Sequence, residues 1–463
     1  MSNTKDAMNE QLGQAKILPL LVRLAIPATA AQLVNALYSI VDRMYIGHMP
    51  GDGTLALSGI GLTFPITMLI AAFSCLPGMG GAPLASIALG EGNQKKAQKY
   101  LCNAITLLLA ISVVMMAVCL LFLEPLLVLF GADAETLPYA SQYLTIYLFG
   151  TVFVEFALGL NPFINTQGHT VIGTMSVVIG AVVNIILDPI LIFGYFGMPR
   201  MGIAGAAVAT VIGQIIAAIL ALVFNLKCNR ELNISMKGFR PNGHLIVQIY
   251  KVGAPSIVVQ AIGSLMTYGM NLILAAFGSA QTVFGIYFKL QSFVFMPVFG
   301  LNNGMVPIIA YNYGAGHKDR VIKTIKHSVA YGVGIMFVGL LAMHIFPAQL
   351  MRMFDAEESL IAIGAPALET ISLSFVFAGF CIVAGSVFQA LGNGVYSMIV
   401  SVARQMCVLL PVAKLLSLSG EVTLIWWAFP IAELASVLLT SYFLVRIYRK
   451  VICHIGEPVV QDA

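Results

Sequence analysis

Twelve long apolar runs constrain the fold of this 463-residue chain more than any other feature. Each run reaches the roughly 20 residues that a helix needs to cross the hydrocarbon core of a bilayer. Hydrophobic residues make up 59% of the chain and charged residues 10%, a composition outside the range of ordinary soluble domains. We therefore expect an all-α, polytopic membrane protein with twelve transmembrane helices. The runs lie near residues 18–46, 57–89, 101–123, 139–164, 171–194, 203–226, 249–277, 284–313, 324–346, 361–390, 395–416 and 422–445.

The lysine and arginine residues predict which side of the membrane each loop faces. An even number of spans places both termini on one side. With a cytoplasmic N-terminus, 18 of the 24 Lys and Arg residues fall in inside segments and 3 in outside loops. Because positive residues concentrate in cytoplasmic loops, we expect a multi-pass protein of the cell membrane with both termini in the cytoplasm.

The two halves of the chain repeat one another. Segment 83–96 matches segment 307–320 at a constant offset of 224 residues, and segment 23–27 resembles segment 251–255 at an offset of 228. Six spans in each half give both copies the same orientation, which predicts two six-helix bundles related by a pseudo-twofold axis around a central cavity. The expected domains are a cytoplasmic tail 1–17, a bundle 18–226, a cytoplasmic linker 227–248, a bundle 249–448 and a cytoplasmic tail 449–463.

Two spans of the first half carry polar residues in a helical pattern. Asn35, Tyr38 and Asp42 share one face of the first span, and Asn184 precedes Asp188 by one turn on the fifth. A carboxylate within a membrane span is expensive and is seldom present without a function. Both spans run outward, and a rise of about 1.5 Å per residue puts the two carboxylates at comparable depth in the outer half. We therefore expect them to meet.

The order of several short motifs across the twelve spans resembles the MATE (multidrug and toxic compound extrusion) family, in its DinF-like bacterial branch. The motifs are Ile26-Pro27, 41–48, 83–92, Asn184 to Pro189, 205–210, 296–301 and 311–316. The resemblance implies a transporter that exports organic, often cationic, compounds in exchange for protons or sodium ions by alternating access. It implies a cation-coupling role for Asp42, Asp188, Asn184, Tyr38 and Thr210, and a substrate-binding role for Asn35, Asn161 and Tyr38.

The second half departs from the branch of the family that binds sodium there with carboxylates. Met270 and Val412 stand opposite the two acidic positions of the first half. In the first half, two nearby carboxylates in a low dielectric cannot both remain ionised at low cost. The pair can hold a proton, or a sodium ion with Asp42, Asn184, Asp188, Thr210 and backbone oxygens as ligands. Pro27 lacks an amide hydrogen and is the expected hinge of the first span.

Each site residue also has a structural interpretation. Asp42 could pair with its neighbour Arg43, although adjacent residues diverge on a helix. Asp188 could cap a kink at Pro189, and Asn161 could satisfy the helix break before Pro162. Asn184 could join two helices, and Thr210 could bond its own backbone. Glu433 or Glu369 in the second half could pair with Arg404 or Lys289.

Other functions find little support in the sequence. The seven cysteines form no CxxC pair, and no Lys-Ser or Lys-Thr follows the glycine clusters as a phosphate loop requires. We expect no enzyme activity, no cofactor beyond the coupling ion and no nucleic-acid partner. Expected partners are small organic cations or drugs and membrane lipids, with a monomer sufficient. The alternative is a lipid-linked oligosaccharide or lipid flippase of the same superfamily.

Overall fold

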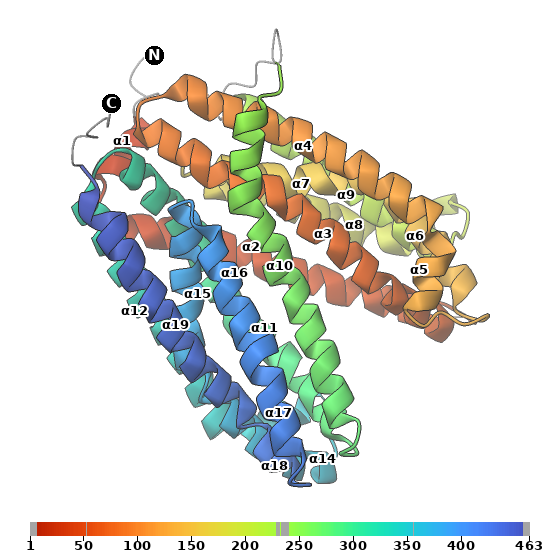
Figure 1. The fold of residues 1–463 in the computed structure, drawn as a ribbon. Helices are drawn as coiled ribbons and strands as arrows, with labels where there is room; N and C mark the ends of the chain where they lie inside the picture. The colour runs from red at the N-terminus through yellow and green to blue at the C-terminus, as the bar shows by residue number, and fades with distance from the viewer. Residues whose placement is uncertain (1–6, 52, 228–231, 233–239, 355, 457–463) are drawn as a thin grey trace. The chain divides into compact units, whose positions relative to one another are not determined.

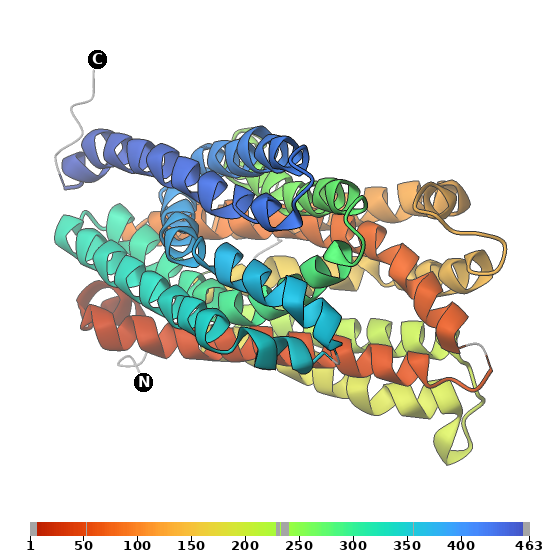
Figure 2. The same cartoon turned by 90° about the horizontal axis from the view of Figure 1, so that it is seen from below.

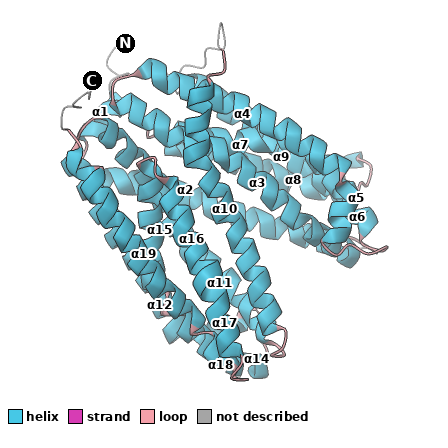
Figure 3. Ribbon diagram, viewed as in Figure 1, coloured by secondary structure: helices cyan, strands magenta, loops and turns pink. Residues whose placement is uncertain are grey.

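A computed structural model describes residues 7–51, 53–227, 232, 240–354 and 356–456. Over these residues the regular structure is helical, with no strand (Figure 3). Ten helices are long and apolar enough to cross a membrane, or twelve when each of two bent pairs is taken as one span, all within the described residues. The all-α, polytopic fold expected from the sequence is confirmed.

The helices of the first half follow the predicted spans closely (Figure 1). They are α1 (Ala7–Gln14), α2 (Ile17–Gly47), α3 (Gly53–Gly90), α4 (Gln94–Leu121), α5 (Leu123–Leu129), α6 (Leu137–Phe149), α7 (Thr151–Asn165), α8 (Thr170–Phe193), the 3-10 turn η1 (Tyr195–Gly197) and α9 (Ile203–Lys227).

The second half repeats this order. Its helices are α10 (Gly243–Leu274), α11 (Ala280–Gly314), α12 (Lys318–Ile345), α13 (Pro347–Arg352), α14 (Glu358–Ser372), α15 (Phe375–Ala390), α16 (Gly394–Val402), the π-helical η2 (Ala403–Leu409), α17 (Leu410–Ser417), α18 (Val422–Ile425), α19 (Ala428–Lys450) and η3 (Ile452–His454).

The fourth span of each half is bent. Helices α6 and α7 meet at 57°, and α14 and α15 meet at 47°. A Cβ at Gly150, between α6 and α7, would lie 2.6 Å from Val211 of α9. The glycine therefore lets α9 approach the bend closely.

Glycines end the repeated helices α3 and α11. Gly92 and Gly316 have φ angles of 73° and 74°, a left-handed conformation that a residue without Cβ adopts at little cost. Because these two glycines are related by the 224-residue offset, the repeat extends to the way its helices terminate.

The contacts of the chain separate it into two compact units. Among the described residues, unit 1 contains 30–88 and 93–254, and unit 2 contains 7–29, 89–92 and 255–456. Helix α2 passes from unit 2 to unit 1 just after Pro27, and α10 passes from unit 1 to unit 2 at Pro255. The hinge role of Pro27 stays a prediction, as do the expected bundle limits. Half of the predicted linker 227–248, residues 228–231 and 233–239, lies outside the described residues, and residues 243–248 form the start of α10.

Helix α9 is the centre of unit 1. It packs against α6, α7 and α8, and α4 packs against α7. The yellow and yellow-green ribbons of α7, α8 and α9 lie side by side in both views (Figures 1 and 2). Small residues at these contacts allow close approach, as is usual between membrane helices.

Helix α15 has the corresponding place in unit 2, where it packs against α11, α12 and α19. A cluster of aromatic rings fills the core near the start of α19, with Phe284 and Phe288 in edge contact at 5.0 Å. Unit 2 also holds a partly buried ion pair, with Arg404 Nη1 2.6 Å from Glu433 Oε1. This is one of the pairings the sequence predicted, whereas Lys289 lies over the Phe354 ring at 5.6 Å.

Helix α1 belongs to unit 2, although the sequence predicted only a cytoplasmic tail over residues 1–17. The Leu12 carbonyl accepts hydrogen bonds from Asn312 Nδ2 at 2.9 Å and from Arg320 Nη2 at 2.8 Å. Arg320 Nε also donates to Asn312 Oδ1 at 2.9 Å. These bonds satisfy a helix-end carbonyl that would otherwise be unpaired.

Candidate functional site

The two carboxylates singled out in the sequence meet inside unit 1. Asp42 lies one to two turns before the end of α2 at Gly47, and Asp188 lies one to two turns before the end of α8 at Phe193. Their carboxyl groups are within hydrogen-bonding reach of each other. Asp42 is 8% exposed and Asp188 is fully buried. The sequence predicted that the two carboxylates lie at comparable depth and meet, and the structure brings them together.

Asn184 and Thr210 complete one side of this pair. The Asn184 amide donates to Asp188 Oδ1 and to Thr210 Oγ1, both at 3.3 Å. The contact between α8 and α9 depends on facing glycines, since a Cβ at Gly180 would lie 2.8 Å from the Gly213 carbonyl oxygen. Close packing of the two helices thus places the polar groups within bonding distance.

Tyrosines complete the other side. The Tyr38 hydroxyl of α2 lies close enough to Asp42, Asp188 and Tyr147 to interact electrostatically with each of them. On α6, Tyr143 contacts the Thr210 hydroxyl and stacks on Tyr147 at 6.2 Å. We did not predict the α6 tyrosines. Their spacing of four residues within an apolar span was the signal that could have identified them, because it places both on one helix face.

Three buried oxygen atoms at the centre of the site accept no hydrogen bond: Asp42 Oδ1, Asp188 Oδ2 and Asn184 Oδ1. Arg43 does not neutralise Asp42. Its side chain is exposed and its guanidinium lies over the Phe64 ring at 5.8 Å. The alternative of a simple ion pair between these neighbours is therefore not supported.

The donor set fits a single positive charge. Two carboxylates about 4 Å apart repel by about 4 kcal/mol at an effective dielectric constant of 20, and one bound cation removes this repulsion. The ligands are oxygens of carboxylate, amide and hydroxyl groups, which suit a hard ion or a proton and not a soft transition metal. In the part of the chain that the structure describes, no three His, Cys, Asp or Glu side chains form a metal cluster.

A small cavity of about 50 Å³ opens beside the pair, within unit 1. It has room for a few water molecules but not for a drug-sized compound. Asn35, Tyr38, Asn184, Thr210 and Gln214 supply its polar lining, and the remaining lining residues are apolar or glycine. Of the predicted substrate residues, Asn35 and Tyr38 therefore lie at the cavity beside the carboxylates.

Asn161 lies apart from this group. Its amide donates to the Ala157 carbonyl at 2.9 Å, and its Oδ1 accepts from Ser176 at 3.1 Å. These bonds are structural, but they do not fill the break at Pro162, because the carbonyl that Pro162 leaves without its helical donor is that of Leu158. The proposed contact of Asn161 with substrate stays a prediction.

Sequence comparisons show which known proteins this chain is similar to. The MatE family model matches residues 27–190 and again residues 255–414. The multidrug export protein MepA of Staphylococcus haemolyticus is 27% identical over 96% of this chain and 97% of its own length.

Solved structures show the same fold. A MATE protein crystallised in a bent conformation matches with a TM-score of 0.89 at 20% identity, over 97% of this chain and 99% of its own. The outward-facing structure of a multidrug resistance transporter matches with a TM-score of 0.87 at 21% identity, over 95% of this chain and 98% of its own.

Proposed function

This chain belongs to the MatE family, and we propose that it exports organic, often cationic, drugs across the cell membrane in exchange for a proton or a sodium ion. Multidrug export itself is supported by the MepA relatives, which align over almost the full chain. The exchange mechanism is our proposal from the geometry of unit 1. Its orientation, with both termini cytoplasmic, rests on the distribution of Lys and Arg.

The observation that carries the exchange mechanism is the contact between Asp42 and Asp188, each with a buried oxygen that accepts no hydrogen bond. Buried polar atoms without partners are costly, and a pair of them on adjacent carboxylates favours binding of a cation. Asn184 and Thr210 position the second carboxylate and can supply further oxygen ligands. An intramembrane site of this kind is typical of ion-coupled transporters.

Helix α2 connects this site to the rest of the molecule. It carries Asp42 in unit 1, while its first residues, up to Thr29, belong to unit 2. Cation binding at Asp42 changes the charge on a helix shared by both units, and Pro27 interrupts the backbone ladder just before the boundary. We infer that cation binding and drug release are linked through bending of this helix.

The flippase alternative receives less support. A carrier of anionic lipid-linked sugars needs cationic side chains that are free to bind phosphate. In unit 2, the Arg404 guanidinium is already paired with Glu433, and the Lys289 ammonium lies over an aromatic ring. Both charges therefore have partners within the protein.

The test is transport into proteoliposomes of a fluorescent organic cation. An imposed pH gradient and an imposed sodium gradient are applied in separate experiments. We expect one of them to drive accumulation of the dye against its own gradient, which also identifies the coupling ion. If neither gradient moves the dye through correctly folded protein, the exchange mechanism is wrong.

A further inference from the structure

A third buried carboxylate in unit 1 lies outside the site described above. Glu155 of α7 is fully buried, and neither of its carboxylate oxygens accepts a hydrogen bond. The side chain lies just after the bend between α6 and α7. An unpaired carboxylate in an apolar bundle costs several kcal/mol, so its retention here calls for an explanation.

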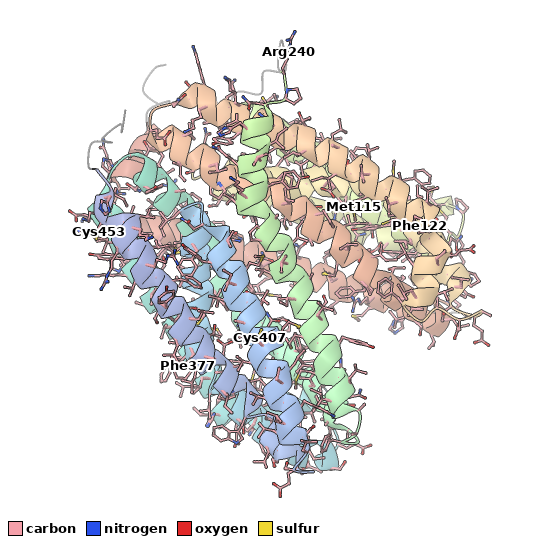
Figure 4. The ribbon with its side chains drawn as sticks, viewed as in Figure 1. Met115, Phe122, Arg240, Phe377, Cys407 and Cys453 are labelled. Atoms are coloured by element: carbon pink, nitrogen blue, oxygen red, sulfur yellow. The ribbon has the colours of Figure 1, made fainter. Side chains whose placement is uncertain are left out.

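The start of α7, which carries Glu155, packs in an apolar part of unit 1. The neighbouring residue Val154 packs in a cluster with Ile70, Met115 and Leu144, of which Met115 is labelled on α4 in Figure 4. Ser74 of α3 lies within hydrogen-bonding reach of the carboxyl group, and Tyr147 of α6 within electrostatic reach.

The titratable groups of the neighbouring helices offer no positive charge close by. Tyr147 of α6 lies close enough to interact electrostatically with Glu155, and Cys119 of α4 belongs to the same apolar cluster as Val154. The three lysines of α4 lie in its first two turns, before the residues of that cluster. On α9, the lone charged residue is Lys227, in the last turn of the helix and far along it from the bend. Within the described residues, then, no ion pair stabilises an ionised Glu155.

The geometry of Ser74 favours a protonated carboxyl group. Its hydroxyl donates to the Ile70 carbonyl at 2.9 Å, so its single hydrogen is already used. A hydroxyl in this state offers Glu155 only its oxygen, which can accept a hydrogen bond and cannot donate one. An acid proton on Glu155 can make that bond, whereas an ionised carboxylate cannot.

A series of polar groups leads from Glu155 to the carboxylate pair. Tyr147 stacks on Tyr143 and lies within electrostatic reach of Tyr38. Tyr143 contacts the Thr210 hydroxyl, which accepts from Asn184 beside Asp188. All of these groups lie in unit 1. Tyrosine hydroxyls can pass a proton by giving up their own and taking another, whereas the Asn184 amide cannot. The proton therefore reaches the pair from the Tyr38 hydroxyl, which lies close enough to Asp42 to interact with its charge.

We propose that Glu155 is a second proton-binding site, which exchanges its proton with the Asp42–Asp188 pair through Tyr147 and the neighbouring tyrosines. A proton fits better than a sodium ion, because sodium needs several oxygen ligands and Glu155 has few oxygens around it. In each transfer, the carboxyl O–H bond of Glu155 breaks, a carboxylate of the pair gains the proton, and Glu155 is ionised until the same path returns a proton to it from the pair. This proposal rests on the proposed exchange function.

Infrared spectroscopy of the purified protein at neutral pH tests the binding site directly. Wild-type protein should show a C=O stretching band of a protonated carboxylic acid that Glu155→Gln lacks. Ser74→Ala should shift the same band, because the acid loses its hydrogen-bond acceptor. The second variant retains the carboxyl group, so it also decides the assignment if the glutamine variant does not fold. An unchanged band in both variants would rule out a protonated Glu155.

Transport tests the connection to the pair. Tyr147→Phe should retain the infrared band but slow proton-driven dye transport by about a hundredfold, the lower range for a positioned proton-transfer group. Exchange of labelled for unlabelled dye at equal concentrations should be unaffected. Glu369→Gln, which removes an acid from unit 2, is the control and should behave as wild type. If the wild-type protein transports the dye and both Tyr147→Phe and Glu155→Gln transport it at the same rate, the relay is wrong and the proposed function stands. If the wild-type protein itself transports no dye, the proposed function is wrong.

Discussion

Replacing Asp42 by Asn removes one of the two charges on which coupling depends, with almost no change in side-chain volume. Asp42 and Asp188 are in contact, and two ionised carboxylates about 4 Å apart repel by about 4 kcal/mol at an effective dielectric constant of 20. The first bound cation relieves this repulsion. Because 1.4 kcal/mol corresponds to a factor of ten, the pair should bind its cation about a thousandfold more tightly than a single carboxylate does.

The Asp42→Asn protein should therefore lose gradient-driven export while it remains folded in the membrane. The assay is efflux of a fluorescent organic cation from energised cells, corrected for the amount of transporter in the membrane. Asp188→Asn should have the same effect, and the double variant should be no worse than either single one, because the two residues act as a unit.

The control is Glu369→Gln, an equally conservative change of an acid that lies within α14 of unit 2. It should export the dye at the wild-type rate. Export by Asp42→Asn within twofold of wild type, at equal protein levels, would show that the carboxylate pair does not couple export to the cation.

Three further predictions concern stability. Arg404→Leu leaves the buried Glu433 carboxylate without its partner at 2.6 Å, so the free energy of unfolding should fall by about 3–5 kcal/mol. Adding Glu433→Gln to the same chain should restore part of this free energy, as measured by denaturation curves. Arg320→Ala removes two hydrogen bonds from the junction with α1, at about 1.5–3 kcal/mol each, so hydrogen exchange near Leu12 should accelerate while the middle of α12 is unchanged. Amides of the loop before α6 donate to Asp133 Oδ1 and hold the pKa of the Asp133 carboxyl below its usual value of 3.8. The stability that these bonds contribute should be complete above pH 3.8 and lost as pH falls through the lower pKa of the folded state. A carbon-detected NMR titration of the Asp133 carboxyl would measure that pKa.

The sequence predicted the fold well because the membrane leaves few choices. Every apolar run of sufficient length had to be a helix, since the bilayer core offers no other backbone partners. The runs near 139–164 and 361–390 were the least accurate predictions, because each is a bent pair of helices. Hydropathy depends on composition and not on the direction of the chain, so it cannot detect a bend or the close approach of α9 that the missing Cβ of Gly150 allows there.

The site was predicted in part. Asp42, Asn184 and Asp188 could be identified because acids and amides in an apolar span are rare and their depths agreed. Tyr143 and Tyr147 were missed, since tyrosine is common in membrane helices and nothing local separates a tyrosine at a site from one at the lipid interface. Only the packing of α6 against α9 brings Tyr143 to Thr210.

The ion pair in unit 2 is a second contact that the sequence alone could not determine. The presence of opposite charges within the spans of the second half suggested that Glu433 or Glu369 could pair with Arg404 or Lys289, but the sequence could not choose between them. The choice depends on the packing of η2 against α19, which is a tertiary contact.

The most direct measurement is the release of cations when the purified transporter binds its cargo. A fluorescent organic cation is added to protein in weakly buffered detergent solution, and released protons and sodium ions are counted with a pH indicator dye and a sodium-selective electrode. We predict that dye binding displaces a proton or a sodium ion from the wild-type protein and neither from Asp42→Asn or Asp188→Asn. Equal release from the wild type and both variants, or dye binding by the wild type without any release, would contradict the proposal that this carboxylate pair trades its cation for the drug.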